Sequence, residues 1–385
     1  MKIKPLNIFL DEKPLFYDEI DYTRMPKAYK SIKSHLPKTK IIHIIGTNGK
    51  GTTGRFLATA LYNLGFSVGH YTSPHIVKFN ERIWINSKDV TDDDLQKAHE
   101  KLFDMLDTKT SNELSYFEYT TFLAMILFQD CDYIIMEAGL GGEHDATAVF
   151  DKLLTVVTPI DIDHVSFLGT SIEEIATAKL NAMQKNIILG KQKFRSVGEI
   201  ADNIAKARGG FVSRYEDFLD KNDFSKIELI SKRLALKSYL VENLKLAISV
   251  LKFLKFDYTE DDFKNAKLFG RLTQIDKNIF IDVGHNPLAA VSIAEALKGK
   301  RYVLVYNSYK DKDYKKILTI LKPVILHVEI IDVFDDRVES SKELQNTLNT
   351  LGIQYSPFTK IDKSLSYLVF GSFSVVEQFL KVYDG

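Results

Sequence analysis

The stretch IIHIIGTNGKGTTGRFLATAL, residues 41–61, joins an apolar run, a glycine-rich break and a helix-like segment. Gly46, Gly49 and Gly51 let backbone N–H groups curl around an anion, and Lys50 supplies a positive charge. The hydroxyl follows the lysine by two positions, whereas the common P-loop has it directly after lysine. A tight turn with a solvent-facing lysine is the plainer alternative. We interpret the stretch as a variant phosphate-binding loop between a strand and a helix.

The length and composition of the chain limit its class. A chain of 385 residues is long for one hydrophobic core and predicts two domains. Lys plus Arg and Asp plus Glu number 51 each, so composition favours neither nucleic acid nor an anionic membrane as a partner. The single cysteine, Cys131, excludes an intramolecular disulfide and a cysteine-based zinc site and is expected in the core. Without a signal-like or membrane-spanning run, we expect a cytoplasmic monomer.

Strand-like and helix-like segments alternate along the chain, which predicts a largely parallel sheet covered by helices. Residues 186–235 look less regular, and we expect peripheral strands there. A second alternating series begins after NAKLFGRL. The sequence therefore predicts an α/β protein with an N-terminal P-loop parallel-sheet domain, residues 1–269, and a smaller C-terminal doubly wound α/β domain, residues 270–385. The predicted boundary lies near Phe269.

Charged side chains follow two of the apolar strands in the first half. Glu137 ends the strand in DYIIMEAG, and Asp161, Asp163 and His164 follow the strand in LLTVVTPI. In open α/β sheets the carboxyl ends of the strands form the ligand site. A buried carboxylate requires a partner, and Mg²⁺ prefers such oxygen ligands beside nucleotide phosphates. A lone histidine is more often structural, but at this edge His164 is a candidate metal ligand.

Lys179 occupies a position where the helical pattern calls for an apolar residue. The spacing of Ile172, Ile175, Ala176, Leu180 and Met183 places this lysine on the apolar stripe of a helix. It either snorkels at the edge of the stripe or is a functional lysine, ion-paired or chemically modified, that points into the site. Periodicity alone leaves both interpretations open.

In the second series, NIFIDVGHNP places Asp282 and His285 between a strand and a helix. Capping explains Asn286 fully, because asparagine is a good N-cap and Pro287 a good first helical residue. Capping does not explain Asp282 and His285, which follow the strand. We expect a nucleotide contact here, with Arg271 as a further cation.

The motifs, in this order, resemble those of the folylpolyglutamate synthase and dihydrofolate synthase family of Mur-type ATP-dependent amide ligases. The matching segments are GTNGKGT, TSPHIVKFNERI, FEYTTFLA, MEAGLGG with DAT, DIDH with SIEEIA, GRL, DVGHNP, DKD and YLVFGSFSVV. The resemblance runs from about Ile41 to the C-terminus. It implies that ATP phosphorylates a carboxylate of dihydropteroate or folate. The amine of L-glutamate then attacks the acyl phosphate.

The resemblance also implies roles for individual residues. The ATP phosphates are assigned to Asn48, Gly49, Lys50, Gly51 and Thr52. Magnesium is assigned to Ser73, Glu137 and His164, and Lys179 matches a lysine that the family carries as a carbamate. Further ATP contacts are assigned to Asn243, Arg271 and Asp282. His285 and Ser372 match glutamate-side contacts, and we count His285 with the cofactor-binding residues. Lys179, Lys50 and His164 are the expected catalytic residues.

Four departures from the family pattern concern the substrate more than ATP. Glu143 and Ala148 stand where Arg and Asn are usual, Tyr239-Leu240 replaces a His-Gln pair, and AKLNA surrounds Lys179 where EKAGI is typical. Two alternatives to a folate-type ligase remain at this stage. One is a Mur-type ligase acting on a cell-wall precursor, and the other is a P-loop NTPase that acts as a switch.

Overall fold

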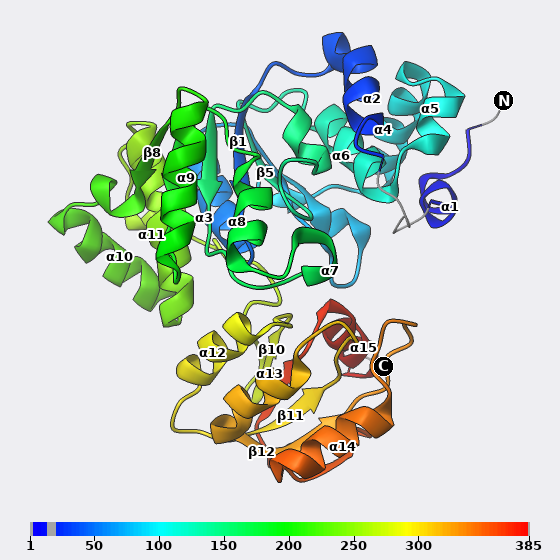
Figure 1. The fold of residues 1–385 in the computed structure, drawn as a ribbon, viewed down its shortest axis with the longest axis vertical. Coiled ribbons are helices and arrows are strands. Elements are labelled where there is room, and N and C mark those ends of the chain that lie inside the picture. The colour runs from blue at the N-terminus through cyan, green and yellow to red at the C-terminus, as the bar shows by residue number, and fades with distance from the viewer. Residues whose placement is uncertain (1–2, 14–20, 384–385) are drawn as a thin grey trace. The chain divides into compact units, whose positions relative to one another are not determined.

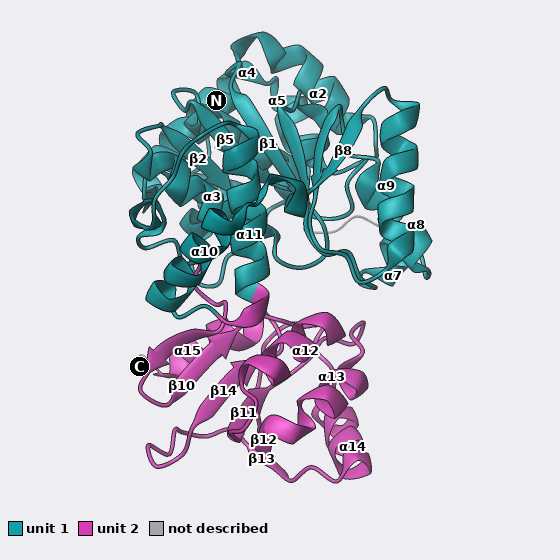
Figure 2. Cartoon of the chain, turned by 90° about the vertical axis from the view of Figure 1, so that its left-hand side faces the viewer, with its two compact units in different colours: residues 1–236, 240–267 teal, residues 237–239, 268–385 magenta. Residues whose placement is uncertain are grey.

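The computed structural model describes residues 3–13 and 21–383, and the chain forms two compact units. Unit 1 comprises residues 1–236 and 240–267, and unit 2 comprises residues 237–239 and 268–385 (Figure 2). Each unit has its own sheet and its own hydrophobic core, which confirms the predicted α/β class. The domain boundary near Phe269 stays a prediction.

Unit 1 is built on an eight-stranded sheet (Figure 1). Two strands at one edge pair antiparallel, and the other six run parallel. In spatial order the strands are β4 (Lys88–Asp89), β3 (Ile83–Ile85), β2 (Val68–Tyr71), β5 (Tyr133–Glu137), β1 (Lys40–Ile45), β6 (Leu154–Val157), β7 (Asn186–Leu189) and β8 (Phe211–Arg214).

Helices cover both faces of this sheet (Figure 1). Side chains alternate along β1, so that Ile41 packs with one layer of helices whereas Ile42 and Ile44 pack with the other. The first layer holds α1 (Leu6–Asp11), α2 (Arg24–Ile32), α4 (Asp92–Met105) and α6 (Tyr116–Leu127), with α5 (Thr108–Glu113) beside them. The second holds α3 (Lys50–Asn63), α10 (Lys221–Leu234) and α11 (Ser238–Phe253). A separate cluster contains α8 (Ile172–Leu180) and α9 (Arg195–Ala207), and α7 (Val165–Leu168) precedes it.

Unit 2 has a six-stranded sheet that is parallel except at one edge. Its order is β13 (Tyr355–Pro357), β12 (Ile325–Ile330), β11 (Tyr302–Tyr306), β14 (Tyr367–Phe370), β10 (Ile279–Asp282) and β9 (Thr273–Asp276). Three helices share its main core, namely α12 (Pro287–Ala296), α13 (Tyr314–Leu321) and α14 (Ser341–Leu351). The last helix, α15 (Phe373–Tyr383), packs against β14.

The expected peripheral strands in residues 186–235 are only partly correct. Strands β7 and β8 are present, but most of SRYEDFLDKNDFSKIELI lies in α10 and in a short 3₁₀ turn before it. Asp220 caps α10, because its carboxylate accepts the N–H groups of Asn222 and Asp223. The buried residues Ile227, Ile230 and Leu234 have helical spacing. The cap and this spacing explain why the segment is a helix.

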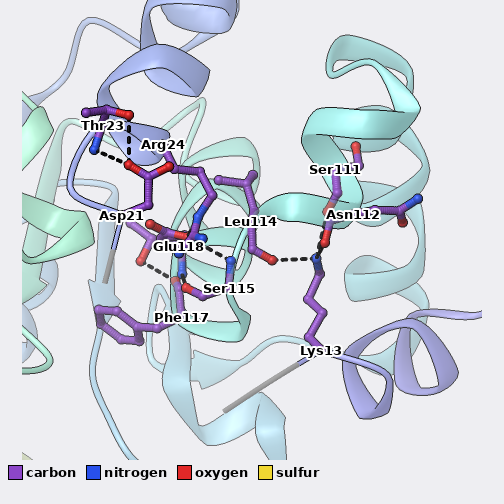
Figure 3. Close-up of polar contacts among 11 residues, drawn as sticks. Lys13, Asp21, Thr23, Arg24, Ser111, Asn112, Leu114, Ser115, Phe117 and Glu118 are labelled. Carbon is purple, nitrogen blue, oxygen red and sulfur yellow. Dashed lines mark hydrogen bonds and ion pairs between the residues drawn. The ribbon is translucent and has the colours of Figure 1, made fainter. Parts of the chain in front are cut away.

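Two buried cations, Lys13 and Arg24, link the N-terminal segment that holds α1 and α2 to α5 and α6 (Figure 3). The Lys13 ammonium donates to the carbonyl oxygens of Ser111 at 2.6 Å and Leu114 at 2.7 Å, at the end of α5. Arg24 donates to Glu118 at 2.7 Å, and this ion pair is largely buried. These contacts hold the N-terminal helices against the core of unit 1.

Candidate active site

The glycine-rich loop follows β1 at the carboxyl edge of the unit 1 sheet and leads directly into α3. Gly49 is the N-cap of α3 with φ of 88°, and a Cβ atom there would lie 2.4 Å from Oδ1 of Asn243. Only glycine meets both conditions. The structure therefore brings Asn243, on α11, against the loop, and its ATP role stays a prediction. The Thr47 and Asn48 N–H groups bond to the Pro159 carbonyl oxygen.

Lys50 begins α3 and points toward the neighbouring strand. Its ammonium lies 3.3 Å from the Thr47 carbonyl oxygen and 3.7 Å from Oε1 of Glu137. Glu137 is the last residue of β5, paired in register with Ile44 of β1. The parallel pairing thus places the loop lysine and the strand-end carboxylate together, as predicted from the order of the strands.

Glu137 also joins the loop that follows β2. The Thr72 hydroxyl donates a short hydrogen bond to Oε2 of Glu137, and the Ser73 N–H lies 3.4 Å from the same oxygen. Two of the predicted magnesium ligands, Ser73 and Glu137, are therefore neighbours. The carboxylate is only 5% exposed, so its charge requires partners, and Lys50, Thr72 and the Ser73 N–H surround it.

The remaining polar residues of that loop organise its own backbone. The Glu81 carboxylate accepts N–H groups from Ile76, Val77 and Lys78 at 2.7–2.8 Å. Arg82 donates to Nδ1 of His75, and burial lowers the pKa of His75 to about 4. Much of the polar character of TSPHIVKFNERI therefore shapes the loop.

His164 follows β6 and is the N-cap residue of α7, with φ of 53°. Its Nε2 lies 3.9 Å from the buried carboxylate of Asp163, and its side chain is partly exposed. Thr47 and Asp161 exchange hydrogen bonds of 3.1 Å, which tie this segment to the glycine-rich loop. Among the described residues, no group of three or more His, Cys, Asp or Glu side chains converges as a metal site. A metal here therefore requires hydroxyl, phosphate or water oxygens as well.

Lys179 is 3% exposed, so it does not snorkel. Among residues 3–13 and 21–383 its ammonium has no hydrogen-bond or ion-pair partner. Burial and, to a smaller extent, the Lys50 charge lower the pKa of Lys179 to about 7, against the opposing effects of Asp163 and Asp145. A large fraction of the Lys179 side chains is therefore neutral near pH 7.

A pocket of about 570 Å³ lies beside α8 in unit 1. Its walls come from residues 140–144, α7 and the exposed side of α8, with Tyr22 from the segment before α2. The rings of Tyr22 and His144 are 4.1 Å apart, and Phe167 adds a further aromatic wall. Gly142 packs against the Lys179 backbone, where a Cβ would lie 2.2 Å from the carbonyl oxygen. The pocket and Lys179 therefore share one helix.

In unit 2, Asp282 ends β10 and organises the turn after it. Its carboxylate accepts the N–H groups of Gly284 at 2.7 Å and Leu272 at 2.8 Å, and the Tyr239 hydroxyl at 3.2 Å. Burial raises the pKa of Asp282, whereas the nearby Arg271 opposes that shift. Tyr239, one of the departures from the family pattern, therefore bonds directly to Asp282.

The other unit 2 candidates lie around the same turn. The Arg271 guanidinium lies 5.3 Å from the centre of the Phe373 ring. It also donates a hydrogen bond to the carbonyl oxygen of Gly270. His285 Nδ1 lies 3.1 Å from the Val283 carbonyl oxygen. The Ser372 hydroxyl accepts the Val375 N–H, at the start of α15. Asn286 caps α12 as predicted.

Known proteins similar to this chain decide its family. No family model matches the chain. The dihydrofolate synthase/folylpolyglutamate synthase of Haemophilus influenzae is 30% identical to it, over 99% of this chain and 94% of that protein. The chain belongs to the dihydrofolate synthase/folylpolyglutamate synthase family. The enzyme of the same name from Buchnera aphidicola (subspecies Schizaphis graminum) is 31% identical, over 88% of this chain and 87% of its own.

Solved structures agree with this membership. The crystal structure of Helicobacter pylori folylpolyglutamate synthetase is 38% identical and superposes with a TM-score of 0.80 over 98% of each chain. Escherichia coli FolC in complex with DHPP and ADP gives a TM-score of 0.81 over 99% of this chain and 98% of its own, at 24% identity, and supports the fold. This family member is an ATP-dependent ligase, as the motifs predict. Among the described helices, none is long and apolar enough to cross a bilayer.

Two departures of this family member meet in the structure. The Asn181 amide, from AKLNA, donates to the Glu143 carboxylate at 2.8 Å. Arg208 in turn donates to the Asn181 backbone carbonyl at 2.7 Å and contacts its amide oxygen at 3.2 Å. Both Glu143 and Asn181 line the 570 Å³ pocket. The departures therefore form one polar wall.

Sequence reasoning missed the aromatic part of this pocket. Tyr22 and Phe167 come from segments far apart in the chain, and neither belongs to a strong motif. The one signal in the sequence was the position of Phe167, an aromatic residue three positions after DIDH, and the structure shows that it is exposed.

Proposed function

We propose that one site in unit 1 joins L-glutamate both to dihydropteroate and to folates, with ATP as the energy source. The observation that carries this is Lys179, which is buried and has no partner among the described residues. It lies near Lys50 of the glycine-rich loop, on the helix that walls a substrate-sized pocket. Relatives named for both activities support it, as does the E. coli FolC structure with DHPP and ADP.

The reaction has two steps. A carboxylate oxygen of the pteroate or folate substrate attacks the γ-phosphorus of ATP, and the bond to ADP breaks. The glutamate amine then attacks the acyl carbon, and phosphate leaves as the amide forms. The backbone N–H groups of the loop and the Lys50 ammonium offset the charge on the transferred phosphoryl group. The Thr52 hydroxyl, in the first turn of α3, is our candidate for a further phosphate or metal contact.

The residues around Glu137 fit a magnesium ion. The Glu137 carboxylate is buried and directed at Lys50, with the Ser73 N–H at its other oxygen, and hard oxygen donors suit Mg²⁺. We assign Ser73, Glu137 and His164 to hold it, and when bound it would neutralise phosphate charge. Glu137→Gln is expected to raise the magnesium concentration for half-maximal activity roughly tenfold or more. An unchanged magnesium titration curve would place the ion elsewhere.

We further propose that Lys179 is carbamylated. Its neutral amine attacks CO₂, a nitrogen–carbon bond forms, and one proton is released. The product is a buried anion beside the Lys50 cation, which removes the repulsion between the two lysines. A carbamate oxygen is also a hard donor of the kind that magnesium prefers.

The 570 Å³ pocket is our candidate for the pterin-bearing substrate. Its volume is in the usual range for small-molecule sites, and its Tyr22, His144 and Phe167 rings offer stacking surfaces. The Glu143 carboxylate can accept the paired N–H donors of an aminopyrimidinone ring. In unit 2, Arg271, Asp282 and His285 stay predicted nucleotide contacts and Ser372 a predicted glutamate contact. We expect the protein to act as a monomer.

The test is ADP release measured with ATP and glutamate and each acceptor in turn. We expect release with dihydropteroate and with tetrahydrofolate, and little with either glutamate or the acceptor alone. A Lys50→Ala variant is expected to lose at least 10²-fold in rate while it stays folded, because Lys50 contacts phosphate rather than the core. ADP release that needs neither glutamate nor an acceptor would favour an NTPase switch. Release only with a cell-wall precursor would favour the other Mur-type activity.

A further inference from the structure

A second pocket, of about 560 Å³, lies in unit 1 along the side of α3. Its walls come from α3, from the β3–β4 hairpin and from the residues around a 3₁₀ turn at Glu260–Phe263. The lining residues are Arg55, Thr59, Asn63, Trp84, Ser87, Asp89, Asp261, Lys264 and Asn265. It shares no lining residue with the 570 Å³ pocket or with the glycine-rich loop.

Arg55 is the unexplained group in this pocket. It is 9% exposed, and its Nε has no hydrogen-bond partner among the described residues. Within the described part of the chain the guanidinium forms neither a hydrogen bond nor an ion pair, and it stacks 4.7 Å from the Trp84 ring centre. Burial lowers the pKa of Arg55 to about 10, so it stays charged at neutral pH. A buried charge without a partner is costly, which indicates a missing anion.

The neighbouring groups favour an anion over a cation. Of the two carboxylates, Asp261 is already paired with Arg233 at 2.6 Å. Asp89 is the other, and burial raises its pKa while Arg55 opposes the shift. Lys264 adds a second cation to the wall. Near Arg55, His70 is fully buried, and neither of its ring nitrogens has a partner in the described part of the chain. Burial puts the pKa of His70 well below the usual value, so it adds no charge.

We propose that this pocket is a second ligand site, which binds a small anion carrying a carboxylate or phosphate group. The anion bonds to the free donors of Arg55, with Lys264 and the Asn63 and Asn265 amides around it. Arg55, Thr59 and Asn63 are spaced four apart, so the site uses one face of α3. Because α3 begins at Lys50, an anion bound here contacts the helix that carries the phosphate-binding loop. This inference does not rest on the proposed function.

Trp84 gives a direct readout, because it is the only tryptophan of the chain and it lies against Arg55. The full chain is titrated with sodium phosphate and, separately, with sodium L-glutamate, while sodium chloride holds the ionic strength constant. We expect a saturable change in tryptophan fluorescence with at least one anion. A response to phosphate alone identifies a phosphate ligand, and a response to glutamate alone identifies a carboxylate ligand. No saturable response to either anion overturns the proposal.

Phosphate also suits the glycine-rich loop, so the titrations are repeated in Lys50→Ala. The Trp84 response is expected to persist there, and its loss would show that the signal comes from the loop and would overturn the site. A negative ADP-release assay would contradict the proposed function but would not change the Trp84 titration. The two proposals are therefore tested independently.

Two variants locate the response. Arg55→Gln is expected to weaken binding roughly tenfold or more, because the charged donor is lost. Since Arg55 is buried, Asp89→Asn provides a second test with the opposite sign: removal of its charge is expected to tighten binding about twofold to fivefold. Lys88→Ala is the matched control, an exposed neighbouring cation that does not line the pocket, and should leave binding unchanged. Unchanged affinity in both Arg55→Gln and Asp89→Asn contradicts the site.

Discussion

Lys13 and Lys179 are both buried lysines of unit 1, yet their surroundings differ. Lys13 is 6% exposed and donates to carbonyl oxygens at the end of α5, with the rings of Phe9 and Tyr119 within 5 Å of its ammonium. Lys179 is 3% exposed, and among the described residues it has no such partner. The like charge that lowers its pKa is that of Lys50, on the glycine-rich loop.

We interpret Lys13 as a structural cation and propose a functional role for Lys179. Burial lowers the pKa of Lys13 to about 8, so at pH 7 it stays mostly charged, as a donor to three carbonyl groups must be. The pKa of Lys179, lowered to about 7 by burial, leaves a large neutral fraction. A neutral amine beside a phosphate site is chemically reactive, whereas a charged amine that caps a helix end contributes to stability.

The largest expected effect is on catalysis. Lys179→Ala is expected to lower the rate of glutamate ligation about 10²- to 10³-fold, because the proposed carbamate is lost from the site. Lys179→Arg should fail as well, since it keeps the charge but cannot react with CO₂. Acetate is expected to restore part of the activity of the alanine variant. A near-normal rate of ligation in Lys179→Arg would contradict the functional role proposed for Lys179.

The second effect concerns stability. Lys13→Ala is expected to lower the free energy of unfolding by about 2–4 kcal/mol, because buried carbonyl oxygens lose their donor and a methylene stem leaves the core. The rate of ligation per folded molecule should stay within about twofold of wild type. Denaturant unfolding and the ADP assay measure the two quantities. A large loss of ligation without a loss of stability would assign Lys13 to the active site instead.

A third expected effect is the pH dependence of stability in CO₂-depleted buffer. Lys179 has a folded pKa of about 7 against an ordinary 10.5, so between these values the unfolded chain holds one proton more. The cost of burying its charge is complete below pH 7 and falls as pH rises toward 10.5. Lys179→Met should therefore be more stable than wild type below pH 7, by a margin that shrinks at higher pH. A margin independent of pH would show that Lys179 titrates normally.

The sequence predicted most of the fold because its strongest patterns are local. The apolar run of β1, the glycine break and the helix after it are contiguous, and parallel pairing then brought Lys50 and Glu137 together. Residues 213–230 were harder, since the cap at Asp220 outweighed a strand-like composition. Several assigned ligands, among them His164 and Arg271, stay predictions.

Periodicity gave the face on which Lys179 lies but not its depth, so snorkelling stayed open until burial decided against it. Depth depends on what packs over a helix, here the loop that includes Gly142. Arg55 was missed for the same reason, because an arginine on an amphipathic helix is usually exposed. The Tyr22–His144 wall joins distant segments, which no local pattern reports.

The most direct test of the comparison is carbon-13 NMR of the full chain equilibrated with ¹³C-bicarbonate near pH 8, with and without magnesium and ADP. The account predicts one carbamate resonance that is present in wild type and in Lys13→Ala and absent in Lys179→Ala. A wild-type spectrum without a carbamate resonance, or a resonance that survives Lys179→Ala, would contradict the account.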